Sequence, residues 1–275
     1  EYDNAKYLGN SKNPYIVLIK AKDTSIASCA INDETKVIAA NAFQSCRNIS
    51  SIKIPNGVTS IGDCAFEDCW RLKNINIPDE VTNIGHNAFS SCGFTSITIP
   101  SSVTSIGYSA FSHCSSLMSI TIPSSVTIIE ESVFWGCSRL TSIEIPDSVT
   151  NIGNSAFSGC RSLTSVTIPS SVTNIGEWVF EECICLKSIN VDKSNEKYKS
   201  IDGVLFTKDE KVLIAYPAKK EETTYIIPSS VTNIGVWAFA YCSNLTSITI
   251  PSRVTSIGND AFCGCSSLTS ITIPS

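Results

Sequence analysis

A unit of about 23 residues, with the pattern V-T-x-I-G-x-x-A-F-x-x-C-x-x-L-T-S-I-x-I-P, recurs through most of the sequence. Its phenylalanines are separated by 23, 23, 22, 23, 23, 23, 59 and 23 residues. A fixed period of this length is typical of a solenoid, in which each unit forms one coil and packs mainly against its two neighbours. The repeat phenylalanines are Phe43, Phe66, Phe89, Phe111, Phe134, Phe157, Phe180, Phe239 and Phe262.

The internal structure of one coil can be read from residues 140–160. In LTSIEIP (140–146), apolar and polar residues alternate and a proline follows, which predicts a short strand with one buried face. Val149 and Ile152 then mark a second short extended segment. The A-F-x-x-C segment has apolar residues at i, i+1 and i+4, which predicts a single helical turn. The sequence therefore predicts a curved, β-rich solenoid with a parallel sheet on its concave face and short helical turns on the other side.

The thirteen cysteines follow the repeat and do not resemble a disulfide framework. Nine of them come three residues after a repeat phenylalanine, so stacked coils place them in one row whose side chains point the same way, whereas a disulfide needs converging Cβ atoms. We therefore expect buried free thiols in this row, Cys29 in the core, and Cys64, Cys185 and Cys263 at variable positions. No four convergent ligands are evident, so no metal or other cofactor is expected. The row comprises Cys46, Cys69, Cys92, Cys114, Cys137, Cys160, Cys183, Cys242 and Cys265.

The repeat divides the chain into four parts. Residues 1–25 contain the apolar run YIVLIK and are predicted to form an N-terminal cap. Repeat coils are predicted over 26–191 and 224–275, and the second set ends directly after an uncapped strand, so we expect the chain to continue or to pack on another molecule. Residues 192–223 form an insertion, in which two apolar runs around a polar turn predict a β-hairpin at 202–217.

The string S-I-x-I-P-x-x-V-T-x-I-G-x-x-A-F-x-x-C closely resembles the BspA-like leucine-rich repeats of bacterial and protist surface proteins, over residues 26–275. The segments YLGNSKNPYIVLIKA (7–21) and NEKYKSIDGVLF (195–206) also resemble segments that accompany those repeats. The resemblance implies a secreted or surface-anchored protein, of a family in which some members adhere to host extracellular matrix or to other microbes. It carries over no catalytic residue.

Aromatic residues gather at the variable positions around A-F-x-x-C. Trp178 and Trp237 share one position, two residues before their phenylalanines, on either side of the insertion. Exposed tryptophan and tyrosine side chains are enriched at recognition hot spots, although the same rings could simply pack along neighbouring coils. Together with the hairpin at 202–217, the predicted ligand face is Tyr108, Trp135, Trp178, Trp237 and Tyr241.

A second surface is the row of serines and threonines on the predicted strands, such as Ser119 and Thr121. Threonine suits solvent-facing strand positions, which explains the row without any ligand. A regular row of hydroxyl groups also suits ice binding, but interrupting charges and the expected curvature argue against a flat template.

Composition and motifs limit the classes of function that the chain can have. The net charge is −5 and the lysines and arginines are scattered, so the basic stripe of a nucleic-acid-binding protein is missing. No apolar run approaches the roughly 20 residues that span a bilayer. His86 and His113 occupy different variable positions, and no nucleophile, phosphate-loop or metalloprotease motif occurs. We predict a non-enzymatic surface protein that binds host or microbial proteins or glycans, and the alternative is a structural spacer that carries another domain.

Overall fold

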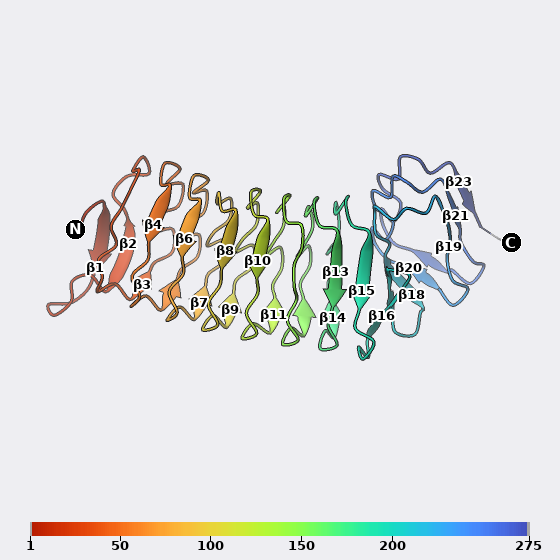
Figure 1. Ribbon diagram of the computed structural model, residues 1–275, viewed down its shortest axis with the longest axis horizontal. Helices are drawn as coiled ribbons and strands as arrows, with labels where there is room; N and C mark the ends of the chain where they lie inside the picture. Colours follow the sequence, from red (N-terminus) through yellow and green to blue (C-terminus); the bar gives the residue numbers. More distant parts are fainter. Residues whose placement is uncertain (1, 274–275) are drawn as a thin grey trace.

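The computed structural model describes residues 2–273, so Glu1, Pro274 and Ser275 of the predicted cap and last coil lie outside the described residues. The chain winds into successive coils that stack along the long axis of the molecule (Figure 1). Most coils contribute one strand of three or four residues and one of two residues. Corresponding strands of successive coils pair in parallel, which confirms the predicted β-solenoid.

The strands fall into two rows and two separate hairpin regions. The longer strands are β4 (Ser51–Lys53), β6 (Asn74–Asn76), β8 (Ser96–Thr98), β10 (Ser119–Thr121), β13 (Ser165–Ile168), β15 (Ser188–Val191), β19 (Thr224–Ile226), β21 (Ser247–Thr249) and β23 (Ser270–Thr272). The two-residue strands are β3 (Val37–Ile38), β5 (Ser60–Ile61), β7 (Asn83–Ile84), β9 (Ser105–Ile106), β11 (Ile128–Ile129), β12 (Asn151–Ile152), β14 (Asn174–Ile175), β20 (Asn233–Ile234) and β22 (Ser256–Ile257). The remaining strands are β1 (Ala5–Leu8), β2 (Val17–Ala21), β16 (Tyr198–Ile201), β17 (Val204–Thr207) and β18 (Val212–Ala215).

Parallel pairing places equal repeat positions side by side. Ile120 of β10 pairs with Ile97 of β8, and Ile152 of β12 pairs with Ile175 of β14. Repeated isoleucines therefore form continuous buried layers, whereas the flanking Ser and Thr positions of the longer strands are mostly exposed. The longer strands form short sheets of two or three strands, so the single continuous sheet that stacking suggests is interrupted.

The helical turn predicted for A-F-x-x-C is wrong: the described residues contain turns there and no helix. In the coil of Phe66, the N–H groups of Cys64, Phe66 and Asp68 donate to carbonyl groups of the next coil at 2.7, 2.8 and 2.9 Å. Cys64 and Asp68 have left-handed backbone, with φ of 53° and 59°. These N–H groups point along the solenoid axis, toward the next coil, so they cannot form the i→i−4 bonds of a helix. We call this set of bonds the inter-coil ladder.

Phenylalanines and cysteines fill the layer beneath this ladder. The rings from Phe43 to Phe180 stack at centroid distances of 5.2–6.1 Å. All thirteen cysteines are free. Within the row, a thiol donates to the carbonyl of the phenylalanine one coil back, as Cys137 Sγ does to Phe111 O at 3.2 Å. Burial raises the pKa of the row thiols from Cys46 to Cys242, to about 12 for Cys114, so these thiols remain protonated at neutral pH.

Both ends of the regular N-terminal stack meet a hairpin. At the start of the chain, β1 pairs antiparallel with β2, and β2 pairs in parallel with β3. In the insertion, β17 pairs antiparallel with β16 and with β18, and β18 then pairs in parallel with β20. The second apolar run of the predicted hairpin is thus the strand that restarts the solenoid.

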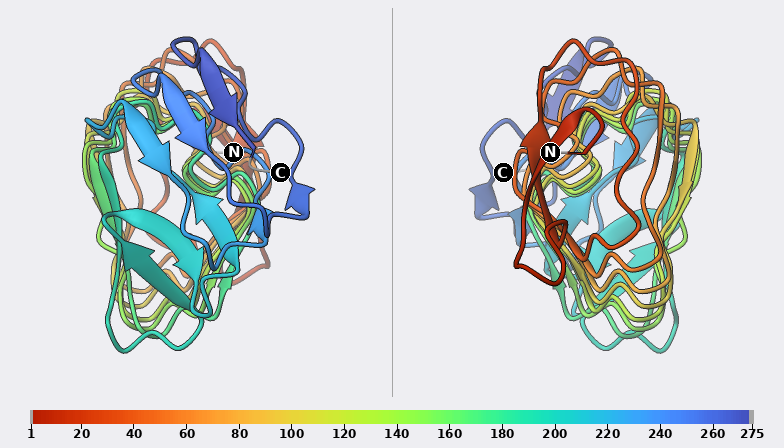
Figure 2. Two further views of the ribbon diagram at one scale, coloured as in Figure 1. Left: turned by 90° about the vertical axis from the view of Figure 1, so that its right-hand side faces the viewer. Right: turned by 90° about the vertical axis from the view of Figure 1, so that its left-hand side faces the viewer.

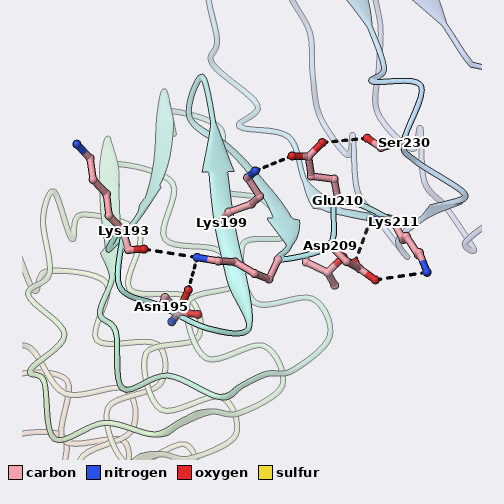
Figure 3. Close-up of polar contacts among 9 residues, drawn as sticks. Lys193, Asn195, Lys199, Asp209, Glu210, Lys211 and Ser230 are labelled. Atoms are coloured by element: carbon pink, nitrogen blue, oxygen red, sulfur yellow. Dashed lines mark hydrogen bonds and ion pairs between the residues drawn. The ribbon is translucent and has the colours of Figure 1, made fainter.

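Polar contacts fix the insertion to its surroundings. The side-chain amide of the buried Asn195 donates to Pro169 O and Val172 O at 2.8 and 3.0 Å. Glu210 accepts from Lys199 Nζ at 2.5 Å and from Ser230 Oγ at 3.0 Å (Figure 3). These bonds join the insertion to the coils on both sides of it. In the end-on views the C-terminal coils, drawn in blue, are displaced from the stack formed by the earlier coils (Figure 2).

We predict that Phe111→Ala lowers the free energy of unfolding by about 3–5 kcal/mol, because it opens a cavity in the middle of the ring stack. Urea denaturation measures the change. Trp70→Ala is the control, since that side chain is 63% exposed and its loss should cost less than about 0.5 kcal/mol. Equal effects of the two substitutions would contradict the stacked core.

Candidate ligand-binding cleft

The inter-coil ladder is interrupted at the coil of Phe180. In the preceding coil the three ladder N–H groups donate to this coil at 2.9, 3.2 and 2.8 Å. The corresponding N–H groups of Trp178, Phe180 and Glu182 have no acceptor among residues 2–273. Backbone donors without a protein acceptor are uncommon away from the ends of a solenoid, so this coil has an open edge inside the molecule.

The ladder resumes with Tyr216, which takes the place of the missing phenylalanine. Its N–H donates to Ala238 O at 2.7 Å, and its ring stacks on Phe239 with centroids 5.2 Å apart. No ring contact joins Phe180 to Tyr216 within the described chain, and Phe180 is only half-buried, whereas Phe157 and Phe239 are fully buried. The ring stack therefore has a gap where the ladder has one.

A cavity of about 370 Å³ occupies this gap. The coil of Phe180 lines one side, the turn of the Phe239 coil lines the other, and the insertion contributes residues of β18 and the tyrosines Tyr198 and Tyr216. Trp178 and Trp237 both belong to the lining. Its size falls within the range of small ligand sites, roughly 300–1,000 Å³. We call it the cleft.

The two tryptophans adopt an unfavourable backbone conformation. Trp178 has a φ of 58° and Trp237 a φ of 57°. The same repeat position elsewhere holds Asn, Ser, Cys or Asp, and Asn and Asp in particular tolerate left-handed backbone, while a bulky side chain there is strained. Trp178 is moreover 39% exposed, so burial offsets only part of this strain. Strained residues of this kind cluster at functional sites.

The electrostatics of the cleft are acidic. Glu177 and Glu181 line it, and none of the described lining residues is a lysine or arginine. Burial raises the pKa of Glu181, although its carboxylate accepts a hydrogen bond from Ser158 Oγ at 3.2 Å. Glu182 is already engaged, by Arg161 Nη2 at 2.6 Å and by the hydroxyl of Tyr241 at 3.3 Å. Glu181 is thus a partly desolvated carboxylate that forms no ion pair in the described chain, since Arg161, which lines a neighbouring hollow with it, pairs with Glu182.

One further polar atom of the lining residues lacks a partner. The side chain of Tyr216 is 5% exposed, and its hydroxyl oxygen has no hydrogen bond within the described chain. A buried hydroxyl without a partner costs about 1–3 kcal/mol. Burial also raises the pKa of Tyr216, so the group is a neutral phenol at physiological pH.

The predicted ligand face separates into several places. Trp178 and Trp237 line the same cleft, and Tyr241 lies beside it, with its ring centroid 6.1 Å from that of Trp237, whereas Tyr108 and Trp135 lie elsewhere. The ring of Tyr108 stacks on that of His86 with centroids 3.9 Å apart, and the backbone N–H of Tyr108 donates to His86 Nδ1. The rings of Trp135 and His113 are in contact, with centroids 4.4 Å apart. Sequence reasoning missed the contribution of Tyr216, although it precedes Phe239 by 23 residues, which is one repeat.

Among residues 2–273, no three His, Cys, Asp or Glu side chains are arranged to hold a metal ion. No helix in the same range is long and apolar enough to cross a membrane.

Comparison with known proteins establishes the family. The BspA type Leucine rich repeat region matches residues 21–94, 82–211 and 218–275 in six copies, and the chain belongs to this family. A leucine rich cell surface protein from Faecalibacterium prausnitzii is 34% identical, with a TM-score of 0.85 over 98% of this chain and 74% of that one. No match was found among curated proteins.

Two other solved structures are similar. The pneumococcal vaccine antigen PcpA is 26% identical, with a TM-score of 0.61 over 90% of this chain, which spans 59% of PcpA. A leucine-rich repeat protein from Eubacterium ventriosum is 23% identical, with a TM-score of 0.54 over 94% of this chain and 65% of that one, and supports the fold alone.

We predict that Trp178→Asn leaves the free energy of unfolding unchanged or raises it by about 1 kcal/mol, because asparagine relieves the left-handed backbone. Chemical denaturation measures the change. The reverse substitution at the same repeat position, Asn87→Trp, should lower stability by a similar amount, since Asn87 has a φ of 53°. A clear loss of stability in Trp178→Asn would mean that the tryptophan is retained for packing.

Proposed function

We propose that this protein is a non-enzymatic cell-surface or secreted protein that binds a partner protein through the cleft. The observation that carries the proposal is that two tryptophans, both in strained backbone, line one cavity where the inter-coil ladder is interrupted. Large aromatic side chains in a concave, partly desolvated site are the usual anchors of protein recognition.

Family membership supports the cellular setting. Repeat solenoids present extended concave surfaces that partners bind. The Faecalibacterium relative is described as a cell surface protein and PcpA as a vaccine antigen. We extend the surface location to this chain and propose a host or microbial surface protein as its partner, with extracellular matrix proteins as the first candidates.

The alternative is a spacer that only carries another domain. A spacer needs an uninterrupted stack, and it gains nothing from tryptophan at a position where asparagine or serine fits the backbone better. The insertion also replaces regular packing with an open cavity, at the expense of stability. Both features favour a binding role.

We expect the chain to bind at least one of immobilised fibronectin, fibrinogen and mucin in biolayer interferometry at physiological salt. We expect no binding to immobilised albumin. The double variant Trp178→Ala/Trp237→Ala should weaken that binding by tenfold or more, since hot-spot truncations cost about 2 kcal/mol or more. Trp135→Ala is the matched control, because Trp135 is 44% exposed and does not line the cleft.

Two results would count against the proposal. Equal losses in the double variant and in Trp135→Ala would remove the cleft as the site. Flat traces for all three proteins would leave the spacer as the better account.

A further inference from the structure

We infer that the cleft binds a peptide segment of the partner, whose carbonyl groups complete the inter-coil ladder and whose arginine side chain enters beside Trp178, Trp237 and Glu181. This inference rests on the proposed function and specifies the chemistry of the ligand.

The open edge of the Phe180 coil defines the backbone of the ligand. In the intact coils, N–H groups at every second residue donate to carbonyls at every second residue of the adjacent segment, as Phe66 does to Ala88. Trp178, Phe180 and Glu182 present the same spacing without acceptors in the described chain. A peptide that follows a similar succession of turns offers carbonyls with this repeat, and addition of a segment to an open backbone edge is a common mode of peptide recognition.

The insertion does not supply these acceptors itself. Its strands β16, β17 and β18 pair with one another, and β18 continues into the next coils through β20. Tyr216 N–H already belongs to the resumed ladder. The insertion therefore pairs with the C-terminal coils and leaves the turn side of the Phe180 coil uncovered. The cleft lies at this uncovered side.

The side chains of the cleft define the charge of the ligand. An anion would suit unpaired N–H groups, but Glu177 and Glu181 line the same space and would repel it. A cation would neutralise Glu181, which forms no ion pair because Arg161 is bonded to Glu182, and whose pKa is raised by burial. Between the two available cations, guanidinium stacks on tryptophan faces and forms paired hydrogen bonds with a carboxylate, and it is less strongly hydrated than ammonium.

The first test selects peptides without assuming a sequence. A random nonapeptide library displayed on phage is panned against the full chain, and the enriched peptides are resynthesised and titrated. We expect enriched sequences that share an arginine. Replacement of that arginine by citrulline, a neutral group of nearly the same shape, should weaken binding by about tenfold or more, as expected for loss of a charged hydrogen bond.

Matched variants of the protein test the role of the acidic lining residue Glu181. Glu181→Gln should weaken the arginine peptide about tenfold and leave the citrulline peptide unchanged. The control is Glu67→Gln, which alters the same repeat position in a distant coil, where the carboxylate accepts from Gln44 at 2.6 Å. Affinity for the arginine peptide should also fall as the pH is lowered toward the raised pKa of Glu181, because protonation removes the charge.

The backbone contact has its own readout. In ¹H–¹⁵N spectra, added peptide should shift the amide resonances of Trp178, Phe180 and Glu182 downfield and protect them from exchange, because each gains a hydrogen bond. The ladder amides of Ser155 and Phe157 in the preceding coil serve as the control and should change little, since they are already bonded.

Several outcomes would overturn the inference. These are no enriched peptide, equal affinity for arginine, lysine and citrulline peptides, no effect of Glu181→Gln, or binding without protection of the three amides. If matrix proteins bind and depend on both tryptophans while peptides fail these tests, the proposed function stands and this inference falls. Binding of a neutral glycan in the cleft, competing with the partner, would also overturn it.

Discussion

The structure depends on hydrogen bonds that run from the backbone of each coil to the next. On the turn side, three N–H groups per coil must point along the solenoid axis, which requires left-handed backbone two residues before and two residues after each repeat phenylalanine. Small polar residues or glycine hold most of these positions because they tolerate that conformation. The phenylalanine stack and the cysteine row follow from the same alignment, since equal side chains are then superposed from coil to coil.

Interrupting this ladder has consequences for chemistry as well as for shape. Where the insertion interrupts the stack, the coil of Phe180 has unpaired backbone donors, and one cavity is lined by the half-buried Phe180, by the carboxylate of Glu181, which forms no ion pair, and by two strained tryptophans. Each of these features lowers stability when the cleft is empty. Features of this kind occur together where a bound ligand supplies the missing contacts. The regular coils on either side hold such a site rigid.

Much of the fold follows from the sequence because the repeat imposes it. The period gives the solenoid, and alternation in segments such as LTSIEIP gives the strands. The spacing of i, i+1 and i+4 does not distinguish a helical turn from the observed turns, because it places Ala, Phe and Cys inward in both conformations. Asn, Ser and Asp at the flanking positions were the available sign of left-handed backbone. Trp178 and Trp237 were recognisable from their shared position, but their meeting at a cleft depends on Tyr216 replacing a phenylalanine, which only the three-dimensional register reveals.

The most direct test of this account is amide hydrogen exchange in the free protein, resolved by NMR. The account predicts rapid exchange at Trp178, Phe180 and Glu182, whose N–H groups lack acceptors in the described chain, and strong protection at Ser155, Phe157 and Gly159, which occupy the same positions one coil earlier. Equal protection in the two coils would show that the ladder is continuous through Phe180, and the open edge on which the cleft depends would not exist.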